Sequence, residues 1–186
     1  MTVIERAKPK LLLHCCCAPC AAGALPQFAG CGYQIEGFFY NPNIQPYTEQ
    51  RARLESFERL MQERELPYSV DDGYPLDAWL RAALDEPQSR CRYCYRSRLQ
   101  RSAEQAVRRG CQAFSTTLLI SPYQQHQLIA EMAQEIGAKY GISFIYIDLR
   151  GGFRSGQQAA RSAGLYMQKY CGCIFSELER YRKDKA

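Results

Sequence analysis

No stretch of this sequence approaches the roughly 20 consecutive apolar residues that a membrane-spanning helix needs. Residues 1–10 also lack the apolar segment of about 7–15 residues that marks a secretory signal peptide. We therefore expect a cytoplasmic protein with no membrane partner, in a compartment where thiols stay reduced. The chain has no internal repeat, low-complexity tract or obvious linker, which predicts one domain over residues 1–186.

The composition excludes a disordered chain, because 46% of the 186 residues are hydrophobic and 23% are charged. The net charge is +5, and 18 of the 24 basic residues are arginine. Arginine matches phosphate geometry, so nucleic acid is one partner that this balance favours. The alternative is that these charges only solvate helix faces.

Short apolar stretches alternate with amphipathic ones along the chain. The patterns predict strands over residues 10–14, 33–40, 67–70, 113–118 and 143–147. They predict helices over residues 21–28, 48–64, 76–84, 87–109, 122–140, 154–165 and 176–183. In the helix over 87–109, we expect Leu99, Ala103, Ala106 and Val107 to face the core.

Strands separated by helices predict an α/β protein with a parallel sheet covered on both faces. Such sheets bind ligands at the carboxyl ends of their strands. A cysteine-rich loop follows the first strand, and Asp148 follows the last. We therefore expect a metal site at this edge of the sheet.

Ten cysteines in a reduced compartment need an explanation other than disulfides. Cys31 and Cys111 are isolated beside predicted strands, and we expect both in the core. The other eight form three tight groups: Cys15, Cys16, Cys17 and Cys20; Cys91 and Cys94; Cys171 and Cys173.

The spacing within these groups suits a metal centre. Cys17 and Cys20 flank Pro19, which stiffens their turn. Cys91 and Cys94 are three residues apart near a predicted helix start, so their sulfurs share one face. Two such pairs supply four thiolates, enough for zinc or for a [4Fe–4S] cluster. A thioredoxin-like redox pair at Cys17 and Cys20 is a third interpretation.

Five stretches carry a resemblance to a known family. They are residues 14–20 (HCCCAPC), 39–44 (FYNPNI), 90–94 (RCRYC), 114–123 (FSTTLLISPY) and 164–173 (GLYMQKYCGC). In this order they resemble the epoxyqueuosine reductases of the QueH family, the cobalamin-independent type. The resemblance implies a HUP-like α/β fold and the last step of queuosine biosynthesis. That step reduces epoxyqueuosine to queuosine at the wobble position of a tRNA with a GUN-type anticodon.

The resemblance also implies two iron centres and an electron donor, whose identity it leaves open. Carried over by motif, the ligands of a [4Fe–4S] cluster are Cys17, Cys20, Cys91 and Cys94. The ligands of a neighbouring mononuclear iron are Cys16, Cys171 and Cys173. Cys15 lies just outside the motif core and receives no role.

Removal of an epoxide oxygen as water also needs proton donors. Asp148, Tyr166 and Tyr170 are the candidates for a catalytic acid. A helix cap or a salt bridge is the alternative for Asp148.

Other residues near the predicted carboxyl edge of the sheet have two interpretations each. His14 is a metal ligand or a hydrogen-bonded residue at a strand end.

Three residues at the end of the second strand have two interpretations: they contact a base or ribose, or they only cap a turn. They are Tyr40, Asn41 and Asn43. The arginines at 90, 92, 96, 98 and 101 line an anticodon stem, or in part only solvate a helix.

Two other functions share some of these features. A HUP-fold tRNA sulfur-transferase would need a Ser-Gly-Gly-x-Asp-Ser-like phosphate loop after the first strand, where this chain has Cys-Cys-Cys-Ala-Pro-Cys. That difference argues against ATP binding. A non-catalytic zinc-binding RNA adaptor would use the same cysteines, but it would be colourless, whereas an iron–sulfur protein is brown.

Overall fold

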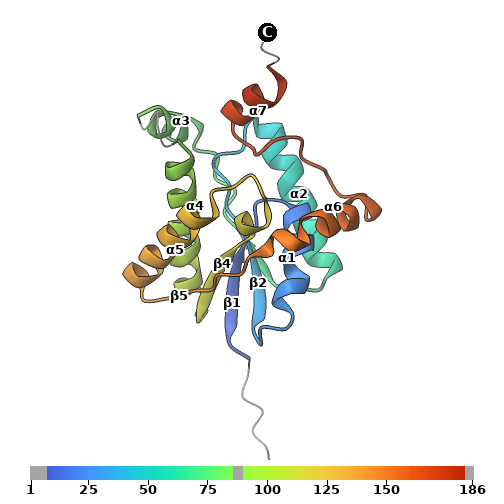
Figure 1. Cartoon of the computed structure of the whole chain (residues 1–186), viewed down its shortest axis with the longest axis vertical. Coiled ribbons are helices and arrows are strands. Elements are labelled where there is room, and N and C mark those ends of the chain that lie inside the picture. The colour runs from blue at the N-terminus through green and yellow to red at the C-terminus, as the bar shows by residue number, and fades with distance from the viewer. Residues whose placement is uncertain (1–7, 86–89, 183–186) are drawn as a thin grey trace, which may run out of the picture.

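The computed structural model describes residues 8–85 and 90–182. Five parallel strands form one sheet in the order β3-β2-β1-β4-β5 (Figure 1). The strands are β1 Lys10–His14, β2 Gln34–Phe39, β3 Tyr68–Val70, β4 Ala113–Thr116 and β5 Ser143–Phe144. This strand order is that of doubly wound nucleotide-binding sheets, and it confirms the predicted α/β class with a HUP-like parallel sheet.

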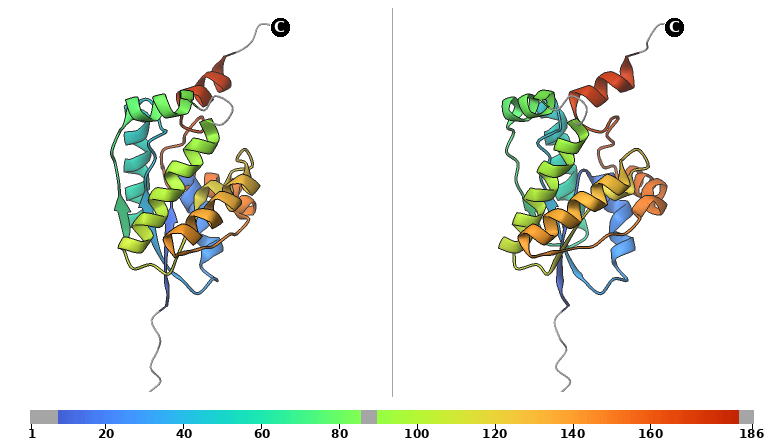
Figure 2. Two further views of the ribbon diagram at one scale, coloured as in Figure 1. Left: turned by 90° about the vertical axis from the view of Figure 1, so that its left-hand side faces the viewer. Right: turned by 60° about the vertical axis from the view of Figure 1, so that its left-hand side comes forward.

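Helices cover both faces of the sheet, which explains why the central strand β1 carries three consecutive buried leucines. On one side α1 packs against α2 and α6, and on the other side α4 packs against α5 (Figure 2). The bounds of these helices are α1 Ala18–Phe28, α2 Tyr47–Glu63, α4 Arg90–Arg108, α5 His126–Tyr140 and α6 Phe153–Ser162. In the described ranges, no helix has the length and apolar character required to cross a membrane.

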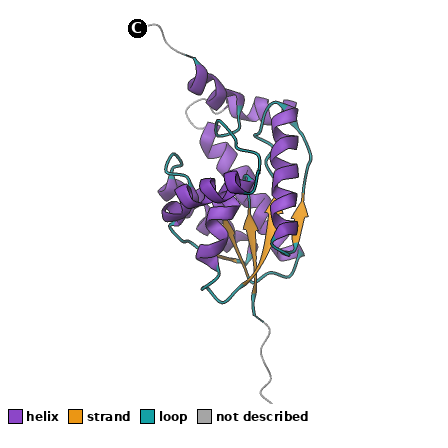
Figure 3. Cartoon of the chain, turned by 90° about the vertical axis from the view of Figure 1, so that its right-hand side faces the viewer, coloured by secondary structure: helices purple, strands orange, loops and turns teal. Residues whose placement is uncertain are grey.

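Two further helices lie beyond the carboxyl ends of the strands, α3 Leu76–Asp85 and α7 Ile174–Tyr181. Figure 3 shows the strand arrowheads pointing toward the end of the molecule where α7 lies. Short 3-10 helices, η1 Thr117–Ile120 and η2 Leu149–Gly152, follow β4 and β5 at the same edge. The functional loops therefore gather at one end of the sheet.

Two predicted strands are shorter than expected. The strand β4 ends at Thr116, because the Thr116 hydroxyl accepts a hydrogen bond from the Leu118 amide and starts η1. The strand β5 comprises two residues. Beyond it, the Ile145 carbonyl accepts a hydrogen bond from the Ser115 hydroxyl at 2.7 Å in place of a backbone amide of β4.

Three other expectations were also wrong. The helix α5 begins at His126 rather than at residue 122. Val107 is 49% exposed, and Cys31 is exposed in the turn after α1. Residues 87–89 and 183 of two predicted helices lie outside the described residues. Cys111 is buried, as expected.

Candidate metal centre

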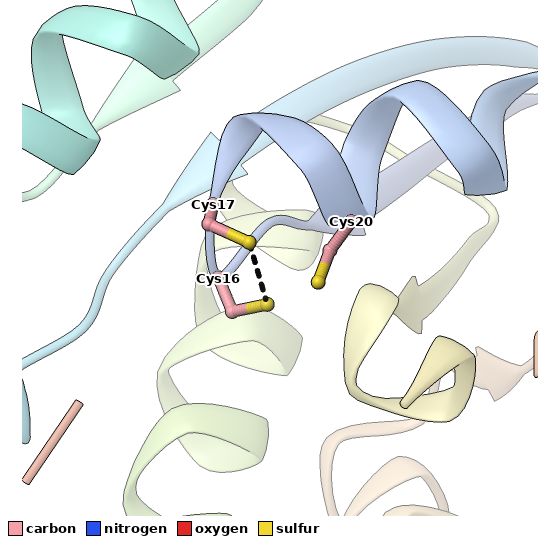
Figure 4. Close-up of side chains that lie close together, drawn as sticks. All are labelled: Cys16, Cys17 and Cys20. Atoms are coloured by element: carbon pink, nitrogen blue, oxygen red, sulfur yellow. Dashed lines mark hydrogen bonds between the residues drawn. The ribbon is translucent and has the colours of Figure 1, made fainter. Parts of the chain in front are cut away.

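The loop between β1 and α1 and the first turn of α1 carry the first cysteine group at the carboxyl edge of the sheet, and Figure 4 shows three of its members, Cys16, Cys17 and Cys20. Cys17 is the N-cap residue of α1 and has an extended backbone, and Pro19 lies in the first turn. The fixed φ of proline suits this position, since its missing N–H is not needed there. Cys20 follows in the same turn, so the sulfurs of Cys17 and Cys20 can face one point.

Cys16, Cys17 and Cys20 form a group of three thiols whose sulfurs all lie within 4.8 Å of one another. The Sγ atoms of Cys16 and Cys17 are 3.7 Å apart and are not joined in a disulfide. Among the residues that the structure describes, only these three cysteines form a group of three or more metal-ligand side chains close enough to hold one ion. We call these three residues the thiol trio. It lies where the sequence predicted a metal site.

Thr117, the first residue of η1, completes the surroundings of Cys16. The Cys16 amide donates to Oγ1 of Thr117 at 3.1 Å, and this hydroxyl donates to Sγ of Cys16 at 3.4 Å. Hydrogen bonds from the thiols of Cys17 and Cys20, and then from Thr117, hold the pKa of Cys16 well below its ordinary value. Burial raises the pKa of Cys17, and the hydrogen bond to Cys16 raises that of Cys20. Cys16 is thus the thiol of the trio that loses its proton at the lowest pH.

Cys15 is not a member of the trio. It is fully buried, and its thiol donates to the Leu13 carbonyl at 3.3 Å. Burial raises the pKa of this thiol, which keeps it protonated. Cys15 is therefore a core residue.

His14 is a hydrogen-bonded residue at the end of a strand, as one of the two interpretations held. Its Nε2 lies 3.0 Å from the Tyr40 carbonyl, and its Nδ1 lies 2.9 Å from Oγ1 of Thr116. Because the carbonyl can only accept, Nε2 carries the proton and Nδ1 accepts from the hydroxyl. Burial lowers the pKa of His14 to about 4, so the imidazole is neutral.

The second and third cysteine groups lie near each other, between α4, α3 and the start of α7. Cys94 is buried on α4, and Cys173 packs against the small cluster that Cys94 forms with Trp79 and Ala83. Nη2 of the buried Arg98 donates to Sγ of Cys94 at 3.0 Å. Burial, with added repulsion from Cys171 and Cys173, raises the pKa of Cys94 to about 12. Cys94 and Cys173 thus share one small cluster, but among the described residues their thiols do not join a group of three that could hold an ion.

Arg53 of α2 holds the segment that carries Cys171. This side chain is 2% exposed, and its Nη1 and Nη2 donate to the carbonyls of Cys171 and Tyr170 at 2.9 and 3.0 Å. Its Nε donates to the buried Glu49 carboxylate at 2.8 Å. Gly172 has φ +143, and its carbonyl accepts from the Gln45 amide at 2.8 Å. A conformation that L side chains rarely adopt therefore presents Cys171 and Cys173.

Sequence reasoning missed four of the polar residues around these thiols. Besides Arg53 and Thr117, Gln168 donates to Sγ of Cys17 at 2.9 Å, and Gln124 donates to Sγ of Cys171 at 3.5 Å. The available signal was that three of these residues lie within or beside the motifs at 114–123 and 164–173. Arg53 had a weaker signal, a Glu-x-x-x-Arg pair on the apolar face of its helix.

The three acid candidates have different environments. Arg150 binds the Asp148 carboxylate through Nε and Nη2, and these hydrogen bonds lower the pKa of Asp148 to about 2. Burial raises the pKa values of Tyr166 and Tyr170 to about 12. Both hydroxyls donate to the protein, Tyr166 to Glu49 and Tyr170 to the Gln45 carbonyl. The tyrosines therefore carry a proton at neutral pH, and Asp148 does not.

The arginines of α4 divide into two kinds. Arg98 is buried against Cys94, and Arg101 forms ion pairs with Asp71 and Glu104. Arg92 is exposed. Part of the series is therefore structural, a role that neither interpretation included.

The donors of the thiol trio fit a soft metal or an iron–sulfur cluster, because thiolates select such centres over hard cations. Three free sulfurs converge, and two of them belong to one helix turn. The fold and this site together define an α/β protein with three converging thiols that could hold a metal at the carboxyl edge of its sheet.

The comparisons with known proteins identify the family. The family model described as "Epoxyqueuosine reductase QueH" matches residues 11–179, and the chain belongs to this family. A protein of that name from Dehalococcoides mccartyi is 35% identical, with 94% of this chain and 96% of that protein aligned. One from Thermotoga maritima is also 35% identical over 93% of each chain. One from Acinetobacter baylyi is 33% identical over 90% of this chain and 80% of that protein.

Proposed function

We propose that this protein reduces epoxyqueuosine to queuosine in tRNA and that its cysteines bind the iron that this reaction uses. The observation that carries the proposal is the thiol trio at the carboxyl edge of the sheet, in a chain of the QueH family. The family relation supports an oxidoreductase that acts on a tRNA nucleotide. No finding favours a zinc-binding adaptor or a sulfur-transferase.

The proposed ligand sets follow the motifs. Cys17, Cys20, Cys91 and Cys94 hold a [4Fe–4S] cluster, and Cys16, Cys171 and Cys173 hold a second iron. The trio supplies ligands to both centres in this scheme. Arg98 supports it, because this buried cation acts on one thiol of each cysteine group, namely Cys94, Cys171 and Cys16.

The reaction converts the epoxide, two electrons and two protons into an alkene and water. When bound, the cluster would supply electrons one at a time, and the second iron would act as a Lewis acid toward the epoxide oxygen. The protein supplies the rest of the chemistry. It positions the base beside the thiol loop, excludes water and delivers the protons.

Tyr166 and Tyr170 are the proposed proton donors, since both keep their protons at neutral pH. The Tyr166 hydroxyl donates to the Glu49 carboxylate, and this contact holds the hydroxyl in position. Asp148 was also proposed as an acid from the sequence. Its low pKa instead suits a role in orienting a substrate amine or in holding Arg150.

The proposed partners are a tRNA with a GUN-type anticodon carrying epoxyqueuosine and an electron donor whose identity is open. The net charge of +5 and the exposed arginines of α4 support contact with RNA phosphates. The cytoplasm is the expected location, because tRNA modification takes place there.

Anaerobic purification followed by iron, zinc and sulfide analysis tests the proposal. We expect a brown protein with more than four irons and about four sulfides per chain, since the scheme has one [4Fe–4S] cluster and a second iron site. Zinc without sulfide would instead support the adaptor function.

A further inference from the structure

A hollow opens at the carboxyl edge of the sheet, beside the site described above. Its volume is about 610 Å³, and its lining residues are Tyr40, Asp71, Gly73, Tyr74, Pro75 and Arg101. Tyr40 follows β2, residues 71–75 follow β3, and Arg101 belongs to α4. Three separate elements therefore build it.

Hydrogen bonds connect this hollow to the thiol loop. Tyr40 lines the hollow, and its carbonyl lies 3.0 Å from Nε2 of His14. The next residue, Asn41, is 1% exposed and donates to the Cys15 carbonyl at 2.9 Å. The hollow is thus fixed relative to the thiols, because β2, which Tyr40 follows, pairs with β1, which the thiol loop follows.

The aromatic residues of the hollow suit a nucleobase. Tyr74 is half-buried, and the ring of Tyr47 packs on it edge-on with a centroid distance of 5.3 Å and an interplanar angle of 74°. This contact holds the Tyr74 ring in place. Gly73 leaves room above Asp71, because an added Cβ would meet only Oδ1 of Asp71, at 3.5 Å. Flat aromatic groups beside open space are the features on which unstacked RNA bases bind.

The charges of the hollow favour a nucleoside over a phosphate. Nε of Arg101 donates to Oδ2 of Asp71 at 2.7 Å, and its Nη1 donates to Oε2 of Glu104 at 3.2 Å. Two carboxylates therefore offset the one guanidinium, and an anion gains little there. Oδ1 of Asp71 can accept a hydrogen bond from a base amine or a ribose 2′-hydroxyl.

We propose that this hollow binds one unstacked nucleoside adjacent to the modified nucleotide in the anticodon loop. Its base stacks on Tyr74 and Tyr40, and Asp71 accepts from its base edge or ribose. The inference rests on the proposed function, because it takes an RNA loop as the substrate. It adds a binding site that would let the protein recognise the loop as well as the epoxide.

The experiment measures the affinity of the iron-loaded protein for RNA hairpins with a tRNA anticodon stem and loop. One hairpin is complete, one lacks the base 5′ of the wobble nucleotide, and one lacks the base 3′ of it. We expect Tyr74→Ala to weaken binding of the complete hairpin on the order of 10-fold, the usual effect of losing one stacking contact. Tyr146→Ala is the matched control. Tyr146 is an exposed tyrosine that follows β5, and β5 and β3 are the two outermost strands on opposite sides of the sheet.

Two results decide the inference. One abasic hairpin should bind wild-type protein on the order of 10-fold more weakly and bind Tyr74→Ala no more weakly than the complete hairpin does. Equal binding of all three hairpins by wild-type protein would overturn the nucleoside site, even if Tyr74→Ala does not fold. If wild-type protein neither binds RNA nor converts epoxyqueuosine in tRNA, the proposed function fails as well. If wild-type protein converts epoxyqueuosine but binds the three hairpins equally, the nucleoside site is wrong and the proposed function stands.

Discussion

The guanidinium of Arg53 donates to the carbonyl of Cys171 at 2.9 Å, across 118 residues of chain. It also donates to the Tyr170 carbonyl, and these two contacts fasten the segment before α7 to α2. The Glu49 carboxylate of the same helix holds the guanidinium in place. Residues 170–173 belong to no helix or strand. Their position therefore depends on a buried cation in a distant helix.

Replacement of Arg53 with Met should lower the free energy of unfolding by about 3–5 kcal/mol, because it leaves the buried Glu49 carboxylate without its partner. Amide hydrogen exchange should also speed up over residues 170–173. Arg51→Met is the control, since Arg51 lies on the same helix in exposed ion pairs and should change stability by about 0.5 kcal/mol or less. Equal stability losses in the two variants would contradict this role of Arg53.

Cys15 and Cys16 are neighbours with different predicted effects on iron content. Cys16→Ala removes a member of the thiol trio and should lower the iron bound per chain. Cys15→Ala removes a buried thiol outside the trio, so it should keep iron at the wild-type level and cost about 1–2 kcal/mol of stability. Iron analysis and thermal unfolding check the pair. Loss of iron in Cys15→Ala with retention in Cys16→Ala would reverse the assignment.

The proposed division between the two iron centres predicts different losses for Cys94→Ala and Cys171→Ala. Cys94→Ala should abolish the broad visible absorbance of thiolate-to-iron charge transfer in a [4Fe–4S] cluster. Cys171→Ala should keep that absorbance and lose the mononuclear iron, as counted by Mössbauer spectroscopy. Cys111→Ala, a buried cysteine outside the proposed ligand sets, is the control. If Cys171→Ala loses the whole cluster, Cys171 is a cluster ligand.

Binding of tRNA should weaken steeply as salt rises, because arginine contacts to phosphates release counterions. With about five such contacts, affinity should fall on the order of 500-fold between 50 and 200 mM salt. Fluorescence anisotropy at several salt concentrations measures the slope. A dissociation constant that stays flat over this range would exclude an electrostatic interface.

The sequence predicted the sheet and the position of the thiol loop because both depend on local patterns. The leucine run of β1 and the Cys-Ala-Pro-Cys turn need no distant partner to be recognised. Val107 shows the limit of such patterns. It follows the buried Ala106 directly, so its side chain points about 100° away from the face of α4 that packs on the sheet.

The partners of the thiols could not be predicted in the same way. Thr117 reaches Cys16 across 101 residues, and Gln168 reaches Cys17 across 151 residues. Such contacts arise from tertiary packing, and neither residue type implies them. The end of β5 likewise depends on the Ser115 hydroxyl, which competes with backbone amides to donate to the Ile145 carbonyl.

The most direct test is nucleoside analysis by mass spectrometry of tRNA that carries epoxyqueuosine, after anaerobic incubation with iron-loaded protein and a chemical reductant. Wild-type protein should form queuosine, and so should Cys31→Ala, whose exposed cysteine lies outside the site. Cys17→Ala should form almost none, because it removes one member of the thiol trio. Unchanged epoxyqueuosine with iron-loaded wild-type protein, or normal conversion by Cys17→Ala, would contradict the proposed function.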